Sequence, residues 1–272
     1  FVFHLAAQSL VKKSYDDPIE TYTTNVVGSL NLLNALREID SIRSLVFITS
    51  DKCYENVEWN WGYRENDRLG GIDPYSASKA SAEILFSSYN RSFFLNKKNF
   101  GAASARAGNV IGGGDWAENR IIPDAVRSIE KKIPLIMRSP NSTRPWQHVL
   151  EPLSGYLLLG EKLYVNPIKY SSSWNFGPST DDIRNVKSVT EDIFKHIGAG
   201  KIKILKSKTK IHEANLLQLN CDKARQVLKW KPRWNVDKTL KETALWYKRL
   251  NEGEKAEDIT REQIYDFFHE LR

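Results

Sequence analysis

The stretch Leu45-Val46-Phe47-Ile48-Thr49-Ser50-Asp51-Lys52 decides the fold class of this chain. Its first four residues form a short apolar run rich in strand formers, which predicts a strand covered on both faces of a parallel sheet. Polar residues follow at once, where the strand is expected to end. Ligands of open parallel sheets bind beyond the carboxyl ends of the strands. We therefore expect Ser50, Asp51 and Lys52 to be site residues.

Apolar runs alternate with helical periodicity on both sides of this stretch. Phe1 to Leu5 predicts a strand, Tyr75 to Asn90 a helix, and Gly101 to Ala107 a strand of small residues. Asp16-Asp17-Pro18 is typical of a helix start, and the helix that follows ends near Asp40. Its apolar residues recur on one face: Ile19, Tyr22, Val26, Leu30, Leu33 and Leu36. This alternation predicts an α/β fold, a Rossmann-like doubly wound parallel sheet.

The composition changes after Trp116, where prolines punctuate shorter elements and Lys and Trp become denser. This change predicts a second, smaller mixed α/β domain. We assign residues 1–114 to the first domain, with 147–178 rejoining it, and residues 115–146 and 179–272 to the second. Helical periodicity predicts helices in 149–164, 222–229, 236–250 and 260–271.

The chain begins inside a strand pattern, without Met and without a preceding turn. We therefore expect an N-terminally truncated sheet, with further strands upstream of Phe1. The glycine-rich turn that lays a pyrophosphate on a helix N-terminus would lie there. Gly108 to Gly114 is rich in glycine, but it comes too late in the chain to replace that turn.

Composition and charge narrow the function classes. The 272 residues are 41% hydrophobic and 27% charged, which excludes a disordered chain. No apolar run reaches the roughly 18 to 20 residues that span a bilayer, so we expect no membrane partner. Two cysteines, Cys53 and Cys221, are too few for a disulfide framework and predict a cytoplasmic location. The net charge of +7 suits a phosphate-bearing partner.

Tyr75 and Lys79 are spaced i, i+4 at the start of the predicted helix, which places both side chains on one face. A nearby ammonium favours the phenolate and lowers a tyrosine pKa, as a proton-abstracting base requires. The spacing alone is weak evidence, because a half-buried Tyr beside a solvated Lys is common. Similarly, Ser50-Asp51-Lys52 alone is as typical of a turn capped by Asp51 as of a catalytic triplet.

Four stretches together resemble the extended short-chain dehydrogenase/reductase family. They are His4 to Gln8, Asn25 to Gly28, Ser50 to Lys52, and Tyr75 to Lys79. Within the family, further stretches resemble the branch that dehydrates CDP-glucose: Thr49 to Tyr54, Trp59 to Tyr63, Gly108 to Trp116 and Thr143 to His148. The resemblance runs from Phe1 to about Leu250, and Lys52 stands where dTDP-glucose dehydratases usually carry Glu.

The resemblance implies an enzyme that uses NAD to convert CDP-glucose to CDP-4-dehydro-6-deoxyglucose and water. It assigns proton abstraction at carbon 4 to Tyr75, proton removal at carbon 5 to Lys52, and protonation of the departing hydroxyl to Asp51. Ser50 would hydrogen-bond the reacting oxygen, and Lys79 would bind the nicotinamide ribose. The first domain would hold NAD and the second the substrate. No metal is expected.

The resemblance also implies binding residues. Ala6 and Ala7 would be the surviving backbone contacts to NAD, so we expect the chain alone to bind NAD poorly. The implied substrate ligands are Gln8, Asn109, Arg120 and Arg144. Guanidinium groups match the geometry of a diphosphate. His148 receives no catalytic role, because a packed histidine is the commoner case.

Relatives pair through helices, so Ile19–Leu36 and Tyr75–Asn90 are the expected faces of a homodimer or homotetramer. The implied pathway makes deoxy-sugars for a bacterial surface polysaccharide such as O-antigen. Three alternatives stay open: an epimerase or a dehydratase acting on another nucleotide sugar, a fragment without activity, and a basic nucleic-acid-binding module. The basic residues are dispersed among acids, so we expect no nucleic-acid partner.

Overall fold

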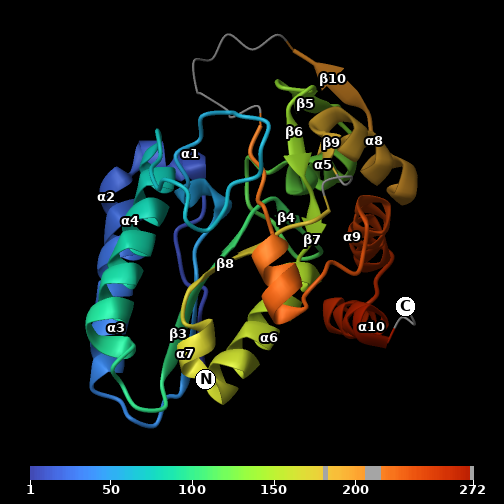
Figure 1. Ribbon diagram of the computed structural model, residues 1–272. Coiled ribbons are helices and arrows are strands. Elements are labelled where there is room, and N and C mark those ends of the chain that lie inside the picture. The colour runs from blue at the N-terminus through green and yellow to red at the C-terminus, as the bar shows by residue number, and fades with distance from the viewer. Residues whose placement is uncertain (180–182, 206–215, 270–272) are drawn as a thin grey trace. The chain divides into compact units, whose positions relative to one another are not determined.

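The structure, a computed structural model, describes residues 1–179, 183–205 and 216–269, which divide into two compact units. Unit 1 holds Phe1–Gly108, Pro152–Gly177 and Leu217–Lys231. Unit 2 holds the described residues of Asn109–Glu151, Pro178–Leu216 and Pro232–Arg272. Each unit is treated by itself below (Figure 1).

Unit 1 is built on a parallel sheet of four strands in the order β1-β2-β3-β8. The strands are β1 (Val2–His4), β2 (Ser44–Ile48), β3 (Gly101–Ala107) and β8 (Ser173–Phe176). In the register, Val46 of β2 lies beside Ala103 of β3. The parallel α/β sheet predicted from the sequence is confirmed.

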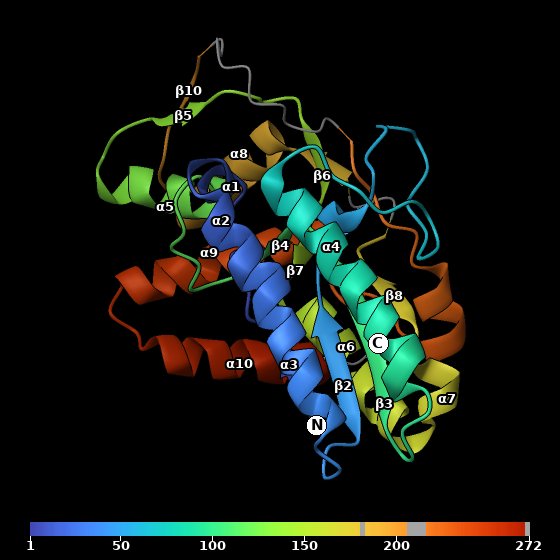
Figure 2. The ribbon, with the colours of Figure 1, turned by 90° about the vertical axis from the view of Figure 1, so that its left-hand side faces the viewer.

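Helices cover both faces of this sheet. Between β1 and β2 run α1 (Val11–Asp16), α2 (Pro18–Tyr22), the π-helical turn η1 (Thr23–Val27) and α3 (Gly28–Arg37). Between β2 and β3 run the 3-10 turn η2 (Asp51–Cys53), α4 (Pro74–Tyr89) and the π-helical turn η3 (Asn90–Phe94). Figures 1 and 2 show α3 and α4 side by side along one face of the sheet. The other face is covered by α6 (Leu150–Val165), with α7 (Pro167–Tyr170) and the π-helical turn η5 (Ala224–Leu228) completing the unit.

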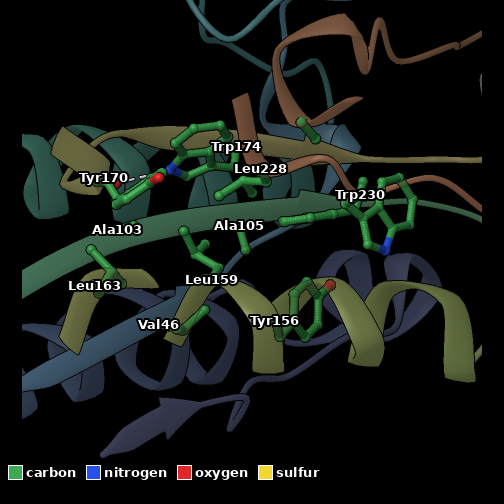
Figure 3. Packing of buried hydrophobic residues seen from close by; sticks show 12 residues of the cluster. Val46, Ala103, Ala105, Tyr156, Leu159, Leu163, Tyr170, Trp174, Leu228 and Trp230 are labelled. Atoms are coloured by element: carbon green, nitrogen blue, oxygen red, sulfur yellow. Dashed lines mark hydrogen bonds between the residues drawn. The ribbon is translucent and has the colours of Figure 1, made fainter. Parts of the chain in front are cut away.

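Alternating side chains on the strands build a core on each face of the sheet. Leu45 and Phe47 of β2 pack with residues of α3 and α4, including Leu33 and Phe86. Val46 points the other way. Figure 3 shows this second core, in which aromatic and aliphatic side chains of α6, β8 and η5 surround the small residues of β3: Val46, Ala103, Ala105, Tyr156, Leu159, Leu163, Trp174, Leu228 and Trp230. Alanines in β3 let the helix on each side lie close to the strand.

Unit 2 combines short strands with longer helices. Its strands pair as β4 (Val110–Ile111) with β7 (Gln147–His148), β5 (Leu135–Met137) with β10 (Ile202–Ile204), and β6 (Thr143–Pro145) with β9 (Ile183–Asn185). Its helices are α5 (Ile121–Glu130), α8 (Val186–Ile197), α9 (Val236–Asn251) and α10 (Ala256–His269). Ile193, Leu240 and Tyr247 are among the buried residues that join α8 and α9 in one core.

The division differs from the predicted domains in two respects. Residues 217–231, assigned from the sequence to the second domain, belong to unit 1 because Ala224, Leu228 and Trp230 pack into the core beneath β8. Asn109 to Gly114 and Gln147 to Glu151 lie in unit 2, where β4 and β7 pair.

The helical face of Ile19 to Leu36 is buried only in its second half. Only Leu33 and Leu36 are buried, whereas Ile19 is 79% exposed. The buried positions of the first half are polar and spaced by four, Thr21, Asn25 and Ser29, and they serve hydrogen bonds described below.

Candidate active site

Polar side chains gather in unit 1 where three adjacent parallel strands end. His4 closes β1, Thr49 and Ser50 follow β2, and Gly108 follows β3. Carboxyl ends of parallel strands meet at one edge of a sheet, which is where ligands of such folds bind. The turn η2 starts at this edge and packs on α4.

The Ser50-Asp51-Lys52 triplet forms a tight 3-10 turn. The hydroxyl of Ser50 donates to Oδ1 of Asp51 at 2.9 Å and accepts from the backbone N–H of Lys52 at 3.2 Å. Asp51 is only 3% exposed, and its carboxylate lies against the backbone of Gly108. The turn is thus capped by Ser50 rather than by Asp51, and Asp51 is left beside the strand ends.

The helix α4 presents Tyr75 and Lys79 on its buried face. Asp73 begins the helix, because its side chain accepts from the backbone N–H of Ser76 at 2.9 Å and Pro74 occupies the first helical position. Tyr75 and Lys79 are 7% and 5% exposed, with the Lys79 Nζ atom 6.0 Å from the centroid of the Tyr75 ring. Burial lowers the pKa of Lys79 to about 8, while the charge of Glu83 acts to raise it.

A hydrogen-bonded connection fixes α4 to the loop after β1. Nδ2 of Asn25, in η1, donates to Oγ of Ser78 at 2.9 Å and to the carbonyl of Gln8 at 3.0 Å. Ser78 in turn donates to the carbonyl of Tyr75 at 2.7 Å, and Oγ of Ser14 accepts from the Tyr75 N–H at 3.1 Å. Asn25 belongs to the Asn25 to Gly28 stretch that carries the family resemblance. Its role in holding the helix of Tyr75 could not be predicted from the sequence and is seen only in the structure.

Gln8, a predicted substrate ligand, is hydrogen-bonded inside unit 1. Its amide nitrogen donates to Oγ1 of Thr21 at 2.8 Å and to the carbonyl of Leu10 at 3.1 Å, and the residue is 8% exposed. Both hydrogen bonds lie inside unit 1 and hold the side chain in the loop after β1. The role of Gln8 toward a substrate stays a prediction. Ala6 is exposed and Ala7 half-buried in the same loop.

The other predicted substrate ligands lie in unit 2. Asn109 has a left-handed backbone, with φ of 51°, and its buried Nδ2 atom has no hydrogen-bond partner among the described residues. Arg120 forms an ion pair with Asp115 at 2.9 Å. Arg144 lies in β6 and donates to the carbonyl of Thr143 at 2.7 Å.

His148 is buried in unit 2, with its ring centroid 4.8 Å from that of Trp234. Its Nδ1 atom accepts from the Leu150 N–H at 3.3 Å, and burial lowers the pKa of the imidazole to about 4. In the described ranges 1–179, 183–205 and 216–269, no three His, Cys, Asp or Glu side chains gather as metal ligands would. Nor does any helix in those ranges combine the length and apolarity needed to cross a membrane.

Comparison with known proteins places the chain. The family model described as GDP-mannose 4,6 dehydratase matches residues 1–243. A CDP-glucose 4,6-dehydratase of Salmonella typhimurium is 47% identical over 271 residues, covering 98% of this chain and 75% of the relative. The chain belongs to the GDP-mannose 4,6 dehydratase family. Its predicted membership of the extended short-chain dehydrogenase/reductases is thereby confirmed.

More distant members share the fold of this dehydratase family. A UDP-glucose 4-epimerase of Mycoplasma pneumoniae is 25% identical, over 91% of this chain and 75% of its own length. The crystal structure of dTDP-glucose 4,6-dehydratase from Bacillus anthracis in complex with NAD matches with a TM-score of 0.74 at 22% identity, covering 92% of this chain and 73% of that one. UDP-glucose 4-epimerase from Thermotoga maritima matches with a TM-score of 0.78 at 21% identity, over 92% and 77%.

Three charged residues of this family member escaped the sequence analysis. Glu83 and Arg106 form a buried ion pair of 2.7 Å in unit 1. Arg184 of β9 stands opposite Arg144 of β6 in the antiparallel register of unit 2. Glu83 could have been noticed from its spacing, one turn beyond Lys79 on the face that carries Tyr75. The sequence carries no signal for the pairing of Arg106 with Glu83 or for the position of Arg184 opposite Arg144, because the two members of each pair are distant along the chain.

Proposed function

We propose that this protein converts CDP-glucose to CDP-4-dehydro-6-deoxyglucose and water, with NAD as a transient oxidant. The observation that carries the proposal is that the Ser50–Lys52 turn packs on the helix that bears Tyr75 and Lys79, at the carboxyl edge of the parallel sheet. The 47% identical relative is named for this reaction. An oxidation at carbon 4 needs the Tyr–Lys pair, and loss of water needs the additional acid and base of the turn.

The residues present fit the nicotinamide end of NAD. Ala6 and Ala7 offer small side chains just after β1, with Ala6 exposed and Ala7 half-buried. Lys79 offers a hydrogen-bond donor on the buried face of α4. When bound there, NAD would supply the hydride acceptor for the oxidation at carbon 4 and the hydride donor for the reduction at carbon 6. The solved dTDP-glucose dehydratase of this fold is described in complex with NAD, which supports the same cofactor here.

Each proton has a carrier among the residues of unit 1. Tyr75, as a phenolate stabilised by the Lys79 ammonium, takes the proton of the carbon-4 hydroxyl as the ketone forms and becomes a neutral phenol. The ketone acidifies the proton at carbon 5, which Lys52 removes. Asp51 protonates the hydroxyl that leaves carbon 6, and Ser50, bonded to Asp51 at 2.9 Å, hydrogen-bonds the reacting oxygen.

Unit 2 supplies the proposed grip on the nucleotide diphosphate. Arg144 and Arg184 occupy opposite positions on paired strands. Arg184 also forms an ion pair with Asp237 at 3.7 Å. Guanidinium groups match the geometry of a diphosphate, which supports these two arginines as its ligands. The buried Nδ2 donor of Asn109 suits the same ligand. Arg120 is proposed as a further cation, released from Asp115 by the substrate.

The deciding experiment incubates the protein with NAD and, separately, CDP-, dTDP-, UDP- and GDP-glucose, followed by mass spectrometry. Loss of one water from CDP-glucose alone supports the proposal. Loss of water from another of these nucleotide sugars would assign the protein's specificity to that nucleotide instead. No loss from any of the four at an NAD concentration that saturates the protein contradicts the proposal. Asp51→Asn separates dehydration from epimerisation: oxidation at carbon 4 survives in the variant while water loss stops, whereas an epimerase would keep its full turnover.

We further propose a homodimer or homotetramer that pairs through α2, α3 and α4. Apolar side chains on these helices of unit 1 point to solvent, with Ile19 79% and Ile84 59% exposed. The free, buried Cys53 and Cys221 suit a cytoplasmic enzyme. Its product would serve the synthesis of deoxy-sugars for a bacterial surface polysaccharide.

A further inference from the structure

The face of α4 that carries Tyr75 and Lys79 continues to a third buried group. Glu83 follows Lys79 by four residues, one helical turn on, and is 1% exposed. Its Oε2 atom accepts from Arg106 at 2.7 Å and from Oγ of Ser104 at 2.9 Å, and its Oε1 atom accepts from the hydroxyl of Thr49. The three hydrogen-bond donors hold the carboxylate of Glu83 in a fixed position.

We propose that Glu83, anchored by Arg106, keeps the side chain of Lys79 protonated and thereby acts as a positioning residue for the Tyr75–Lys79 pair. This inference rests on the proposed function, to which it adds a residue without contact to substrate or cofactor. Buried ammonium groups lose their proton unless a negative charge compensates for the lost hydration. Lys79, 5% exposed, needs such a charge to support a phenolate at Tyr75.

The other titratable groups around the pair cannot supply that charge as well as Glu83 does. His4 of β1 is uncharged at neutral pH, because burial and the charge of Lys79 lower the pKa of its imidazole. Cys53 of η2 stays a neutral thiol, because burial raises its pKa. Asp51, also in η2, acts in the proposed reaction as the proton donor to the substrate, so it does not serve as the counter-charge of Lys79. Arg106 of β3 is itself positive.

Arg106 is held from several sides, which explains why Glu83 does not turn away from α4. Its guanidinium donates to the hydroxyl of Tyr54 at 2.7 Å, to the carbonyl of Glu65 at 3.0 Å and to Oγ of Ser173 at 3.1 Å. Tyr54 in turn donates to Asn175 at 2.8 Å. The network spans β3, β8 and the loop after η2, so the carboxylate of Glu83 is fixed by the sheet, independently of the helix.

The test uses Glu83→Gln, which keeps the shape and one acceptor but removes the charge, with Glu83→Asp as the conservative rescue. Ser104→Ala is the matched control, because it removes a hydrogen bond of Glu83 without changing its charge. The first readout is the pH dependence of kcat. Tyr75 must be deprotonated and Lys79 protonated, so activity rises and then falls with pH.

In Glu83→Gln the acid limb of this profile moves to higher pH and the alkaline limb to lower pH, each by about one pH unit, and the bell narrows. In Glu83→Asp and Ser104→Ala, both limbs of the pH profile of kcat stay at their wild-type positions. A uniform loss of kcat in Glu83→Gln with unmoved limbs would overturn the proposal, since a purely structural defect gives that result.

The second readout needs neither substrate nor turnover. The phenolate absorbance of Tyr75 is titrated in the folded protein as the difference from Tyr75→Phe. In Glu83→Gln this titration moves to higher pH, with circular dichroism confirming the fold. An unmoved titration in a folded variant overturns the inference even if CDP-glucose is dehydrated. A moved titration in a protein that dehydrates no nucleotide sugar supports the inference and contradicts the proposed function.

Discussion

The carboxylate of Asp51 lies directly against the backbone of Gly108, so closely that a Cβ atom at residue 108 would overlap with its oxygens. The glycine at the end of β3 therefore sets the position of the proposed acid at the end of β2. Any side chain at 108 must displace Asp51 or the strand end.

Gly108→Ala is accordingly expected to abolish dehydration with little loss of folding. A displacement of about 1 Å at a catalytic group can lower the rate by about 100-fold, so we expect kcat to fall by at least that factor. Gly28→Ala is the control, because its added Cβ finds its nearest neighbour 3.7 Å away, at the carbonyl of Thr23. Equal turnover in the two variants would contradict the assigned role of Asp51. Mass spectrometry of CDP-glucose incubations measures both.

The cap of α4 links stability to catalysis. Asp73→Ala removes the side-chain acceptor of the Ser76 N–H and should cost about 1 kcal/mol of the free energy of unfolding. The first turn also carries Tyr75, so kcat should fall as well. Asn235→Ala removes the equivalent cap of α9 in unit 2, where its side chain accepts from Lys238. We expect similar urea denaturation curves for the two variants and reduced turnover only for Asp73→Ala.

The opposed arginines of β6 and β9 should govern substrate affinity. Arg144→Ala and Arg184→Ala are each expected to raise KM for CDP-glucose by about tenfold, because a charge-assisted hydrogen bond contributes roughly 1.5 to 3 kcal/mol. Arg261→Ala removes an exposed arginine of unit 2, paired only at the surface with Glu257, and should leave KM unchanged. Steady-state kinetics measures KM for CDP-glucose in the three variants. An unchanged KM in Arg144→Ala would refute the role of Arg144 in substrate binding.

The buried imidazole of His148 makes the protein sensitive to acid. Its pKa of about 4 lies below the usual 6.5, so the unfolded chain binds a proton more readily between these values. Stability is thus fully present above pH 6.5 and falls by up to about 1.4 kcal/mol per pH unit toward pH 4. His148→Gln should flatten this slope in urea denaturation, whereas a substitution of the exposed His269 by Gln should keep it. An unchanged slope in His148→Gln would argue against a neutral buried imidazole.

Association through the helices can be tested at two exposed apolar positions. Ile19→Lys and Ile84→Lys place charges on the proposed faces of α2 and α4, and desolvating an unpaired charge opposes pairing. We expect multi-angle light scattering to report a dimer or tetramer for the wild type and a monomer for the variants. Ile168→Lys, at an 85% exposed position on α7, is the control and should keep the wild-type mass.

The sequence by itself determined the elements whose signals are local. The apolar run at 45–48 predicted β2, and the Asp16-Asp17-Pro18 start predicted α2. The spacing of Tyr75 and Lys79 placed both side chains on one helical face, which the structure shows to be buried. Linked motifs were specific enough to predict the family, which the 47% identical relative confirms.

Only the tertiary structure decided which polar groups are buried together. The residues from Ile19 to Leu30 carry an apolar stripe, but the sheet side of the helix is polar because Thr21, Asn25 and Ser29 complete hydrogen bonds to distant segments. Glu83 and Arg106, 23 positions apart, become neighbours only when β3 pairs beside β2 under α4. Hydrophobic periodicity reports burial of apolar surface, whereas a buried polar group depends on partners that folding alone brings within hydrogen-bond distance.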